Sequence, residues 1–297
     1  MQNNTYVLVS ACRNEGDYVD GLIDCIVSQR LRPACWIIVD DGSTDGTYER
    51  AASRVQDVPF LKVVKASGFH SRSFTSQVYA AQYGAELLKG EPFDFIGFLD
   101  ADIRLGAGYY EKVIQALEKD PQLGIAGGIV IDTYPDRRAG SRRGSEDHHV
   151  AGGVQLFRRQ CFEQIGGYTP IDGGGQDTIA EVMAMMKGWR IRTFPEIAVE
   201  HLRPGGFSGD TVLAHGMKWG RKFRLLGYHP LYYFGQCVRR LGWRPYVIGS
   251  LCQLLGFMVA AMHHERRPVS PEFVCFLRKI QMQRLRSVLR VPAGPDR

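Results

Sequence analysis

The alternation of apolar runs with amphipathic stretches in the first 130 residues constrains the fold of this chain more than any other feature. Five runs are rich in β-formers and almost continuously apolar, and we expect them to be strands: residues 5–11, 35–41, 60–66, 93–100 and 123–131. Four stretches between them carry apolar residues at helical spacing: 17–29, 45–55, 74–89 and 108–119. Strands that are apolar on both sides are typical of a parallel sheet covered on both faces. The pattern predicts a mostly parallel, doubly wound α/β sheet, in which ligands bind beyond the carboxyl ends of the strands.

The following seventy residues are less regular. Residues 132–150 have no apolar periodicity and contain four arginines, so we expect a mobile loop there. A strand and a helix are expected within 152–167, and the glycine run at 172–177 opens a further helix. The alternating pattern of 190–202 predicts paired edge strands.

Charge divides the chain into two parts. The net charge of +6 is the balance of residues 1–202, with 21 Lys/Arg and 27 Asp/Glu, and residues 203–297, with 16 Lys/Arg and 4 Asp/Glu. The net charges of these parts are therefore −6 and +12. We expect an acidic catalytic body at 1–204 and a basic helical extension at 205–297 that meets an anionic partner. The apolar fraction of 44% excludes a disordered chain.

The basic extension favours a lipid surface as that partner. Residues 218–244 interleave cations with Trp, Tyr and Phe, as in interfacial amphipathic segments. Residues 246–262 lack charge but are shorter than the roughly 20 residues that span a bilayer, so an in-plane or re-entrant helix and a core helix both stay open. A second amphipathic helix is expected at 267–290, capped near Ser270. No nucleic-acid-binding motif is present, so an anionic membrane surface is favoured over nucleic acid.

The seven cysteines are expected to be free thiols in a reducing cytosol. Their number is odd, and no two lie at C-x-x-C spacing, which also argues against a zinc site. Residues 1–30 show no signal-peptide pattern.

Two carboxylates, Asp100 and Asp102, follow the predicted strand at 93–100 in the stretch "FLDAD". Residues i and i+2 of an extended stretch point the same way, so both carboxylates would face one pocket. Hard oxygen ligands suit Mg²⁺ or Mn²⁺, which keep positions open for a substrate diphosphate. The alternative is that Asp100 caps the strand and Asp102 begins a turn.

Further motifs join this pair in a fixed order. "SACRNEGDYVDGLIDCIVSQ" follows the first predicted strand, "VDDGSTDGTYE" follows the second, and the stretch 152–202 comes downstream. Together they resemble family 2 glycosyltransferases, inverting enzymes with the GT-A fold, over roughly residues 5–202. The resemblance implies a nucleotide-sugar half at about 1–130 and an acceptor half at about 131–204.

The resemblance implies the following nucleotide-binding residues: Ala11, Arg13, Asn14, Glu15, Asp41, Arg72 and Asp100. Asp41 would accept the N3–H of uracil in a charge-assisted hydrogen bond. The family's usual proline and tyrosine are Ala11 and Arg13 here, so the Arg13 guanidinium would replace the tyrosine ring in stacking on the base. Asp40 and Asp41 could instead cap the next helix, but we expect Ser43 or Thr44 to do so.

The resemblance also implies the metal ligands and the catalytic base. Asp102 would bind Mn²⁺ or Mg²⁺ directly, Asp100 would contact the ribose or a water bound to the metal, and His201 would be a further ligand or an ordinary hydrogen-bonded histidine. Asp177 would deprotonate the acceptor hydroxyl. Gly175 and Gln176 would contact the acceptor, with Gln176 in place of the family's usual glutamate.

Asp177 has a second interpretation as the N-cap of the helix that follows it. Both roles are compatible if Thr178 takes over capping.

The predicted function is a metal-dependent inverting glycosyltransferase. Its donor would be a nucleotide-sugar, with UDP as the expected nucleotide, and its acceptor a lipid-linked or polysaccharide glycan. We expect it at the cytoplasmic face of the inner or plasma membrane, with the cytoplasm as second choice. The alternatives are a nucleotidyltransferase, which would need a Gly-rich loop that "SACRNEG" does not provide, and a non-catalytic sugar- or nucleotide-binding scaffold.

Overall fold

The computed structural model describes residues 5–66, 74–133, 139–143, 149–171, 174–203, 211–242, 246–263 and 265–290. The chain forms two compact units, Met1–Gly205 and Gly206–Arg297. Unit 1 is an α/β unit and unit 2 is helical.

Unit 1 is built on one mixed sheet in the order β3-β2-β1-β4-β8-β6-β9-β5, with β7 paired to β6. The strands are β1 (Tyr6–Cys12), β2 (Cys35–Asp40), β3 (Leu61–Lys65), β4 (Phe95–Phe98), β5 (Ile103–Arg104), β6 (Leu123–Thr133), β7 (Ala139–Arg143), β8 (Leu156–Arg158) and β9 (Arg190–His201). The first four strands are parallel to one another, β8 is antiparallel to β4 and β6, and β9 is parallel to β6. The expected α/β fold with a mostly parallel sheet is confirmed.

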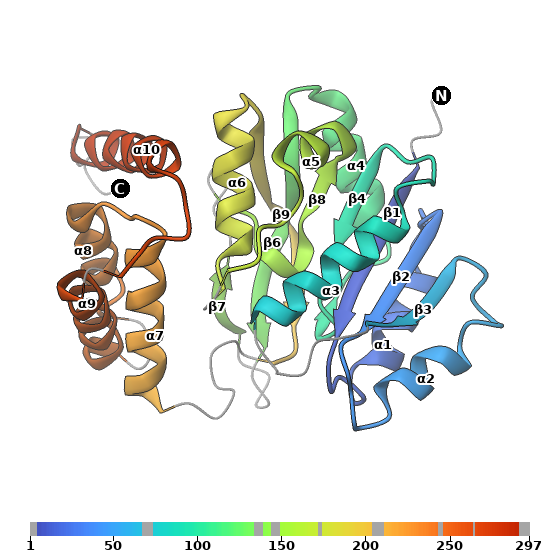
Figure 1. Ribbon diagram of the computed structural model, residues 1–297. Coiled ribbons are helices and arrows are strands. Elements are labelled where there is room, and N and C mark those ends of the chain that lie inside the picture. The colour runs from blue at the N-terminus through green and yellow to red at the C-terminus, as the bar shows by residue number, and fades with distance from the viewer. Residues whose placement is uncertain are drawn as a thin grey trace, which may run out of the picture. The chain divides into compact units, whose positions relative to one another are not determined.

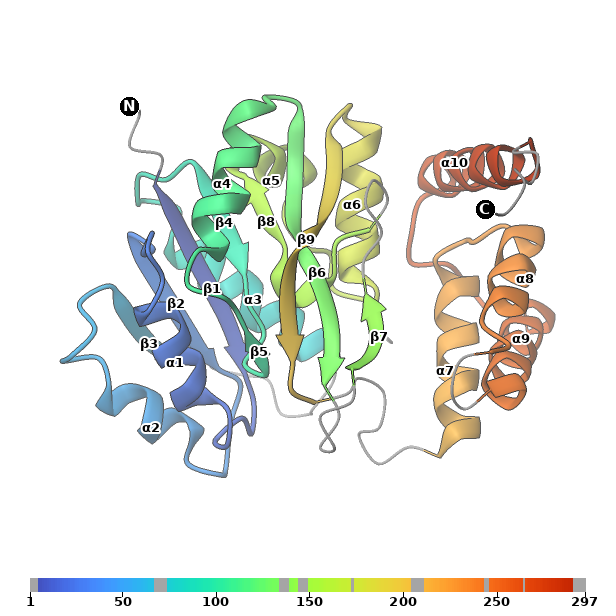
Figure 2. The same ribbon diagram turned by 180° about the vertical axis from the view of Figure 1, so that it is seen from behind.

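Helices cover both faces of this sheet. They are α1 (Val19–Val27), α2 (Thr47–Ser53), α3 (Phe74–Leu87), α4 (Tyr109–Lys119), α5 (Arg159–Ile165) and α6 (Gln176–Met186). In Figure 1, α3, α5 and α6 lie in front of the sheet, and Figure 2 shows α1 and α4 on the opposite face. The core strands are almost fully buried, as in β2, where all six residues are buried. Burial on both faces explains their continuous apolar sequence.

The expected pair of edge strands at 190–202 is wrong, because these residues form the single strand β9. β9 lies between β6 and the two-residue strand β5. Its pairing with β6 shifts between Phe194 and Ala198, which leaves Pro195 outside the regular ladder. A proline has no N–H for a ladder hydrogen bond and is tolerated at such an irregularity. The alternation in the sequence was therefore real, but the break in it marked a bulge and not a turn.

The expectation of a loop throughout 132–150 is also wrong in part. Residues Ala139–Arg143 form β7, which pairs antiparallel with β6. The sequence "AGSRR" contains no β-formers, so pairing with the long strand β6 supplies the backbone hydrogen bonds that composition does not indicate.

Unit 2 contains four helices in the part of the chain that is described: α7 (Val212–Leu225), α8 (Pro230–Arg239), α9 (Tyr246–Met262) and α10 (Pro271–Arg290). Glycines bring α7 and α9 into backbone contact. A Cβ at Gly220 would collide with the Gln253 carbonyl, and one at Gly256 would collide with the Met217 backbone. As expected, the Ser270 hydroxyl caps α10 by accepting from Phe273 N at 3.2 Å.

The apolar helix α9 therefore has one packed face and one exposed face. Gly249, Cys252, Gly256 and Phe257 are buried, whereas Ile248, Leu251, Leu255, Met258 and Met262 are exposed. Among the described helices, none combines the length and apolar character needed to cross a membrane. All seven cysteines are free, and only Cys275 among them is exposed.

Candidate active site at the carboxyl edge of the sheet

The carboxyl ends of β1, β2, β4, β6 and β9 meet at one edge of unit 1, because these strands share one direction. The residues at or just beyond these ends are Ala11, Asp40, Asp41, Asp100, Asp102, Asp132 and His201. Acidic residues from three separate stretches of chain, after β2, β4 and β6, thus gather at one edge with His201 from β9. This is the edge where open α/β sheets bind ligands.

The loops after β1 and β2 hold each other through side-chain to backbone hydrogen bonds. Asn14 N donates to Ser43 Oγ at 3.0 Å, and Thr44 N donates to Asn14 Oδ1 at 2.8 Å. Glu15 N donates to the Thr47 hydroxyl at 2.8 Å. Asn14 has a φ of 55°, a left-handed conformation that asparagine tolerates better than most residues. Asn14 and Glu15 therefore build this wall of the site.

The expectation that Ser43 or Thr44 caps α2 is wrong. The N-cap is Gly46, whose φ is 87° and which has no side chain to offer. Asp45 takes the capping role in its place, since its carboxylate accepts from Thr47 N at 3.1 Å and from Gly16 N at 2.8 Å. Ser43 and Thr44 are already hydrogen-bonded to Asn14, so the next residue, Asp45, caps the helix in their place.

Asp41 is 3% exposed, and its Oδ1 is buried with no hydrogen-bond partner in the structure. A buried carboxylate oxygen without a hydrogen-bond donor lowers the stability of the folded protein, so a bound ligand or water commonly supplies the donor. Nη1 of Arg13 lies 3.5 Å from Asp41 Oδ2. Asp41, which is predicted to accept from the nucleobase, and Arg13, which is predicted to stack on it, are thus neighbours. Asp40 Oδ1 is likewise buried without a hydrogen-bond partner.

Asp102, His201 and Asp132 form a chain of side chains across the edge. His201 Nδ1 lies 2.7 Å from Asp132 Oδ1, and His201 Nε2 lies 3.4 Å from Asp102 Oδ2. All three residues are buried. Asp132 orients the imidazole so that Nε2 faces Asp102, which is the arrangement in which a carboxylate supports a metal-binding histidine.

Arg203 adds a cation beside Asp102. Its Nη2 lies 2.9 Å from Asp102 Oδ2 and 2.7 Å from Glu15 Oε1. Arg203 therefore joins the loop after β1 to the acidic pair, across 188 positions of sequence.

The two carboxyl groups of the Asp-x-Asp pair differ in their pKa values. Burial and then the adjacent Asp102 raise the pKa of Asp100 well above its ordinary value. Burial acts in the same direction on Asp102, but His201 and Arg203 together lower its pKa. Asp102 is thus the more acidic member of the pair.

The side chains at this edge of the sheet fit a divalent cation that also binds ligands from outside the protein. Asp102 offers a carboxylate oxygen and His201 an imidazole nitrogen, a combination suited to Mn²⁺. Within the described residues, no group of three His, Cys, Asp or Glu side chains is arranged as a complete metal site. Water and a substrate diphosphate would supply the remaining ligands, as is usual for Mg²⁺ and Mn²⁺.

Asp177 lies against the same site through the turn at Gly152 and Gly153. A Cβ added at Gly152 would be 3.2 Å from Asp177 Cβ, and one added at Gly153 would be 2.5 Å from Asp100 Oδ2. Asp100 N also donates to Gly153 O at 3.1 Å. Two adjacent glycines therefore lie between the predicted base and the Asp-x-Asp pair, and a Cβ at Gly153 would require Asp100 to move.

Asp177 is not the N-cap of α6, which settles the capping alternative. The cap is Gly175, with a φ of 110°, and Gln176 and Asp177 belong to the first helical turn. Thr178 does not cap the helix either: its backbone N–H donates to Asp177 Oδ1 at 2.8 Å. Gln176 folds back so that its Oε1 accepts from Gly175 N at 3.0 Å.

A buried network supports Asp177 from one helical turn further along. Glu181 Oε1 accepts from Val150 N at 2.6 Å and from Gln155 Nε2 at 3.1 Å, and Gln155 Oε1 accepts from the Tyr168 hydroxyl at 2.6 Å. Burial raises the pKa of Glu181 above its ordinary value, and His149, 3.1 Å away, opposes that shift. This network holds the turn with Gly152 and Gly153 against α6.

Four residues of the site were not predicted from the sequence: Arg203, Asp132, Glu181 and Gln77. Gln77 Nε2 donates to Asp100 Oδ1 at 3.3 Å. Arg203 had a signal, since it follows the predicted metal ligand His201 by two positions. Asp132 had none, because it fell in a stretch expected to be a loop. The predicted phosphate-contacting residue Arg72 lies outside the described residues.

Comparison with known proteins identifies the family. A model of the family described as glycosyl transferase family 2 matches residues 7–170. This chain belongs to glycosyl transferase family 2. The matched residues include the β1 and β2 loops, the Asp-x-Asp pair and the Gly152–Gly153 turn, whereas Asp177 and His201 lie beyond the match.

The curated relatives of this family-2 chain are distant. It is 23% identical over 137 residues to the N-acetylglucosaminyl-diphospho-decaprenol L-rhamnosyltransferase of Mycobacterium tuberculosis, in two strains. The match covers 44% of this chain and 44% of the relative.

Solved structures share the fold over more of the chain. A mannosyltransferase of Pyrobaculum calidifontis in complex with GDP-Man and Mn²⁺ is 16% identical, with a TM-score of 0.57 over 97% of this chain and 81% of that one. TarS of S. aureus in complex with UDP-GlcNAc is 14% identical, with a TM-score of 0.55 over 92% and 78%. GalNAc-T7 with UDP, GalNAc and Mn²⁺ is 17% identical, with a TM-score of 0.60 over 100% and 60%. At these identities the likeness shows the GT-A-type fold.

Proposed function

We propose that this protein is a metal-dependent inverting glycosyltransferase that moves a sugar from a UDP-linked donor to a lipid-linked glycan acceptor. The observation that carries the proposal is the turn at Gly152 and Gly153, which contacts both Asp177 and Asp100. A base and a diphosphate-binding pair on either side of two glycines leave one place where a hydroxyl could attack an anomeric carbon. An inverting transfer needs the base and the leaving diphosphate on opposite sides of the anomeric carbon.

The residues of this chain have distinct tasks in the proposed reaction. Asp41 would accept from the nucleobase with its unpartnered Oδ1, and Asp102 and His201 would hold the cation, with Asp100 beside it. The cation would act as a Lewis acid for the departing diphosphate. Asp177 would accept the proton of the acceptor hydroxyl at its free carboxylate oxygen, since Oδ1 is engaged by Thr178 N.

Two observations support a lipid-linked acceptor at a membrane. The distant relative acts, by its name, on a decaprenol-linked substrate. Unit 2 also exposes apolar side chains along α9 and α8, including Leu251, Leu255 and Phe234, and this part of the chain is strongly basic. Apolar side chains beside cations are typical of segments that lie in an anionic membrane interface.

A thermal-shift comparison of UDP-, GDP- and dTDP-sugars, with and without Mn²⁺, tests the donor. We expect a UDP-sugar with Mn²⁺ to raise the unfolding midpoint most, because a ligand of the folded state stabilises it by mass action. Asp102→Asn should abolish the Mn²⁺-dependent part of this shift, whereas Glu200→Gln, which removes an exposed charge from β9, should retain it. If no nucleotide-sugar shifts the midpoint, or if the two variants behave alike, the proposed donor site is wrong.

A further inference from the structure

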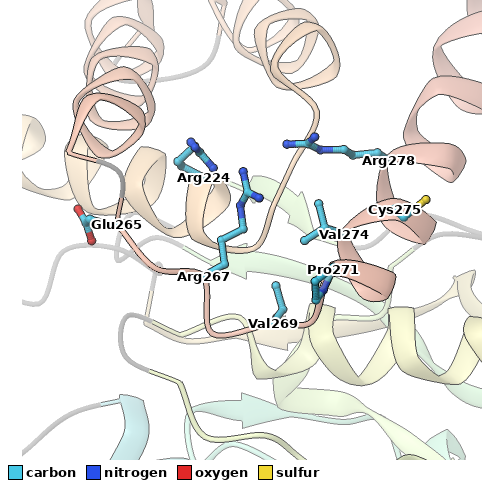
Figure 3. Close-up of a pocket in the computed structure, with 8 residues that line it drawn as sticks. All are labelled: Arg224, Glu265, Arg267, Val269, Pro271, Val274, Cys275 and Arg278. Carbon is cyan, nitrogen blue, oxygen red and sulfur yellow. The ribbon is translucent and has the colours of Figure 1, made fainter.

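A second charged hollow lies within unit 2 and is made only of unit-2 residues. It has a volume of about 640 Å³. Arg224 of α7, Arg267 of the α9–α10 connection and Arg278 of α10 line it, and Figure 3 shows their side chains converging from three sides. Val274 also lines it.

Within the described residues, no carboxylate neutralises the arginines of this pocket. The one acidic residue in the lining, Glu265, is bound by Arg221, with Nη2 to Oε2 at 2.6 Å and Nε to Oε1 at 3.1 Å. Among the described residues, Arg224 and Arg267 form no ion pair, and Arg267 Nε is buried without a hydrogen-bond partner. Three guanidinium groups thus face one hollow with no carboxylate free to pair with them.

The like charges affect one another. Burial and then the nearby Arg267 lower the pKa of both Arg224 and Arg278. Packing nevertheless keeps the groups together. Arg278 Nε donates to Gly227 O at 2.9 Å, and one turn along α10 the Gln281 Oε1 accepts from His229 N at 2.8 Å. The pocket is therefore preorganised for a ligand that relieves the repulsion.

We propose that this pocket binds a phosphate monoester or diphosphate group. Such a group carries about two negative charges, opposite in sign to the three arginines, because Glu265 of the lining is already paired with Arg221. Guanidinium groups form bidentate, charge-assisted hydrogen bonds to phosphate oxygens. The volume exceeds that of a phosphate alone, and Val269, Pro271 and Val274 offer an apolar wall to the organic part that the phosphate is attached to.

Titration of the full-length protein with inorganic pyrophosphate, measured by calorimetry with divalent metals chelated, tests this site. We expect one binding event, weakened about tenfold or more by Arg267→Gln, since a hydrogen bond to a charged group is worth about that much. Arg266→Gln is the matched control, because Arg266 is the neighbouring residue, is exposed and does not line the pocket. It should change the affinity less than twofold.

Vesicle flotation distinguishes a lipid headgroup from a soluble phosphate. Vesicles with phosphatidic acid carry a phosphate monoester, and vesicles of equal surface charge with phosphatidylglycerol carry a diester. If Arg267→Gln also weakens binding to vesicles with phosphatidic acid but not to vesicles with phosphatidylglycerol, the bound phosphate group belongs to a lipid. If it appears with pyrophosphate alone, the group is soluble. Absence of pyrophosphate binding, or equal losses in Arg266→Gln and Arg267→Gln, would overturn the site without touching the proposed transferase activity.

Discussion

At the residue scale, the proposed role of Asp177 as the proton acceptor predicts the effect of a single substitution. Asp177→Asn keeps the shape of the side chain, and the Asn Oδ1 can still accept from Thr178 N. Loss of a general base typically lowers a rate by about 10²–10⁴-fold. We expect sugar transfer to fall by that factor while the affinity for the donor, measured by calorimetry, stays within about twofold. Transfer at the wild-type rate, or a parallel loss of donor affinity, would contradict the role of base.

Asp132 would act on the proposed metal site through His201. Because Asp132 holds His201 Nδ1 at 2.7 Å, it fixes which ring nitrogen faces Asp102. We expect Asp132→Asn to lower the affinity for Mn²⁺ about 10- to 100-fold in the presence of UDP, as observed for such supporting carboxylates. The affinity is measured by the paramagnetic resonance signal of free Mn²⁺. Glu200→Gln, an exposed neighbour on β9, is the control and should leave it unchanged. Unaltered Mn²⁺ affinity in Asp132→Asn would show that His201 is not a ligand.

At the scale of elements, the close contact of α7 and α9 depends on glycine. A methyl group at Gly220 has no space, because it would collide with the Gln253 carbonyl on α9. We expect Gly220→Ala to force the helices apart and to lower the free energy of unfolding of unit 2 by about 1–3 kcal/mol. Chemical denaturation followed by tryptophan fluorescence would report it, since Trp219 lies on α7.

Gly235 provides the matched control for that experiment. It lies within α8, and a Cβ there would meet nothing within 4 Å. Gly235→Ala should therefore stabilise the helix by about 0.5–1 kcal/mol, because alanine loses less backbone entropy. If both substitutions shift stability in the same direction, close glycine packing is not what joins α7 and α9.

At the scale of the whole molecule, the exposed row on α9 predicts membrane binding. Leu251 and Leu255 are 57% and 44% exposed, so their replacement by Gln should change stability by less than about 0.5 kcal/mol. Inserted in a bilayer, each would contribute about 1.5–3 kcal/mol. We expect the double variant to bind anionic vesicles at least tenfold more weakly in a sedimentation assay. Leu213→Gln on α7 serves as a control of similar exposure.

The salt dependence separates the two contributions to that binding. The cationic part should weaken as ionic strength rises, because salt screens exposed charges, whereas the contribution of Leu251 and Leu255 should persist. Full-length protein that ignores anionic vesicles at low salt would place the chain in the cytoplasm and favour a soluble acceptor.

Local patterns in the sequence determined the first half of the fold and the position of the acidic pair. Strand and helix periodicities are properties of ten-residue windows, so β1 to β4 and the helices between them were predicted to within a few residues. The place of Asp100 and Asp102 at a strand end followed from the same windows. The position of Asp41 at the end of a strand was predicted in the same way. The cap of α2 was not, since Asn14 from another loop forms hydrogen bonds with Ser43 and Thr44.

Only the tertiary structure decided which distant residues complete the site. Insertion of β9 beside β6 brings His201 to Asp132, 69 positions earlier, and the end of β9 brings Arg203 to Glu15, 188 positions earlier. No local pattern encodes such pairings, because they depend on the order in which strands far apart in the sequence lie in the sheet. The placement of Asp177 beside Gly152 and of Asp100 beside Gly153 is of the same kind. The sequence by itself determined the chemistry that each strand end presents, and long-range strand order determined which of those ends act together.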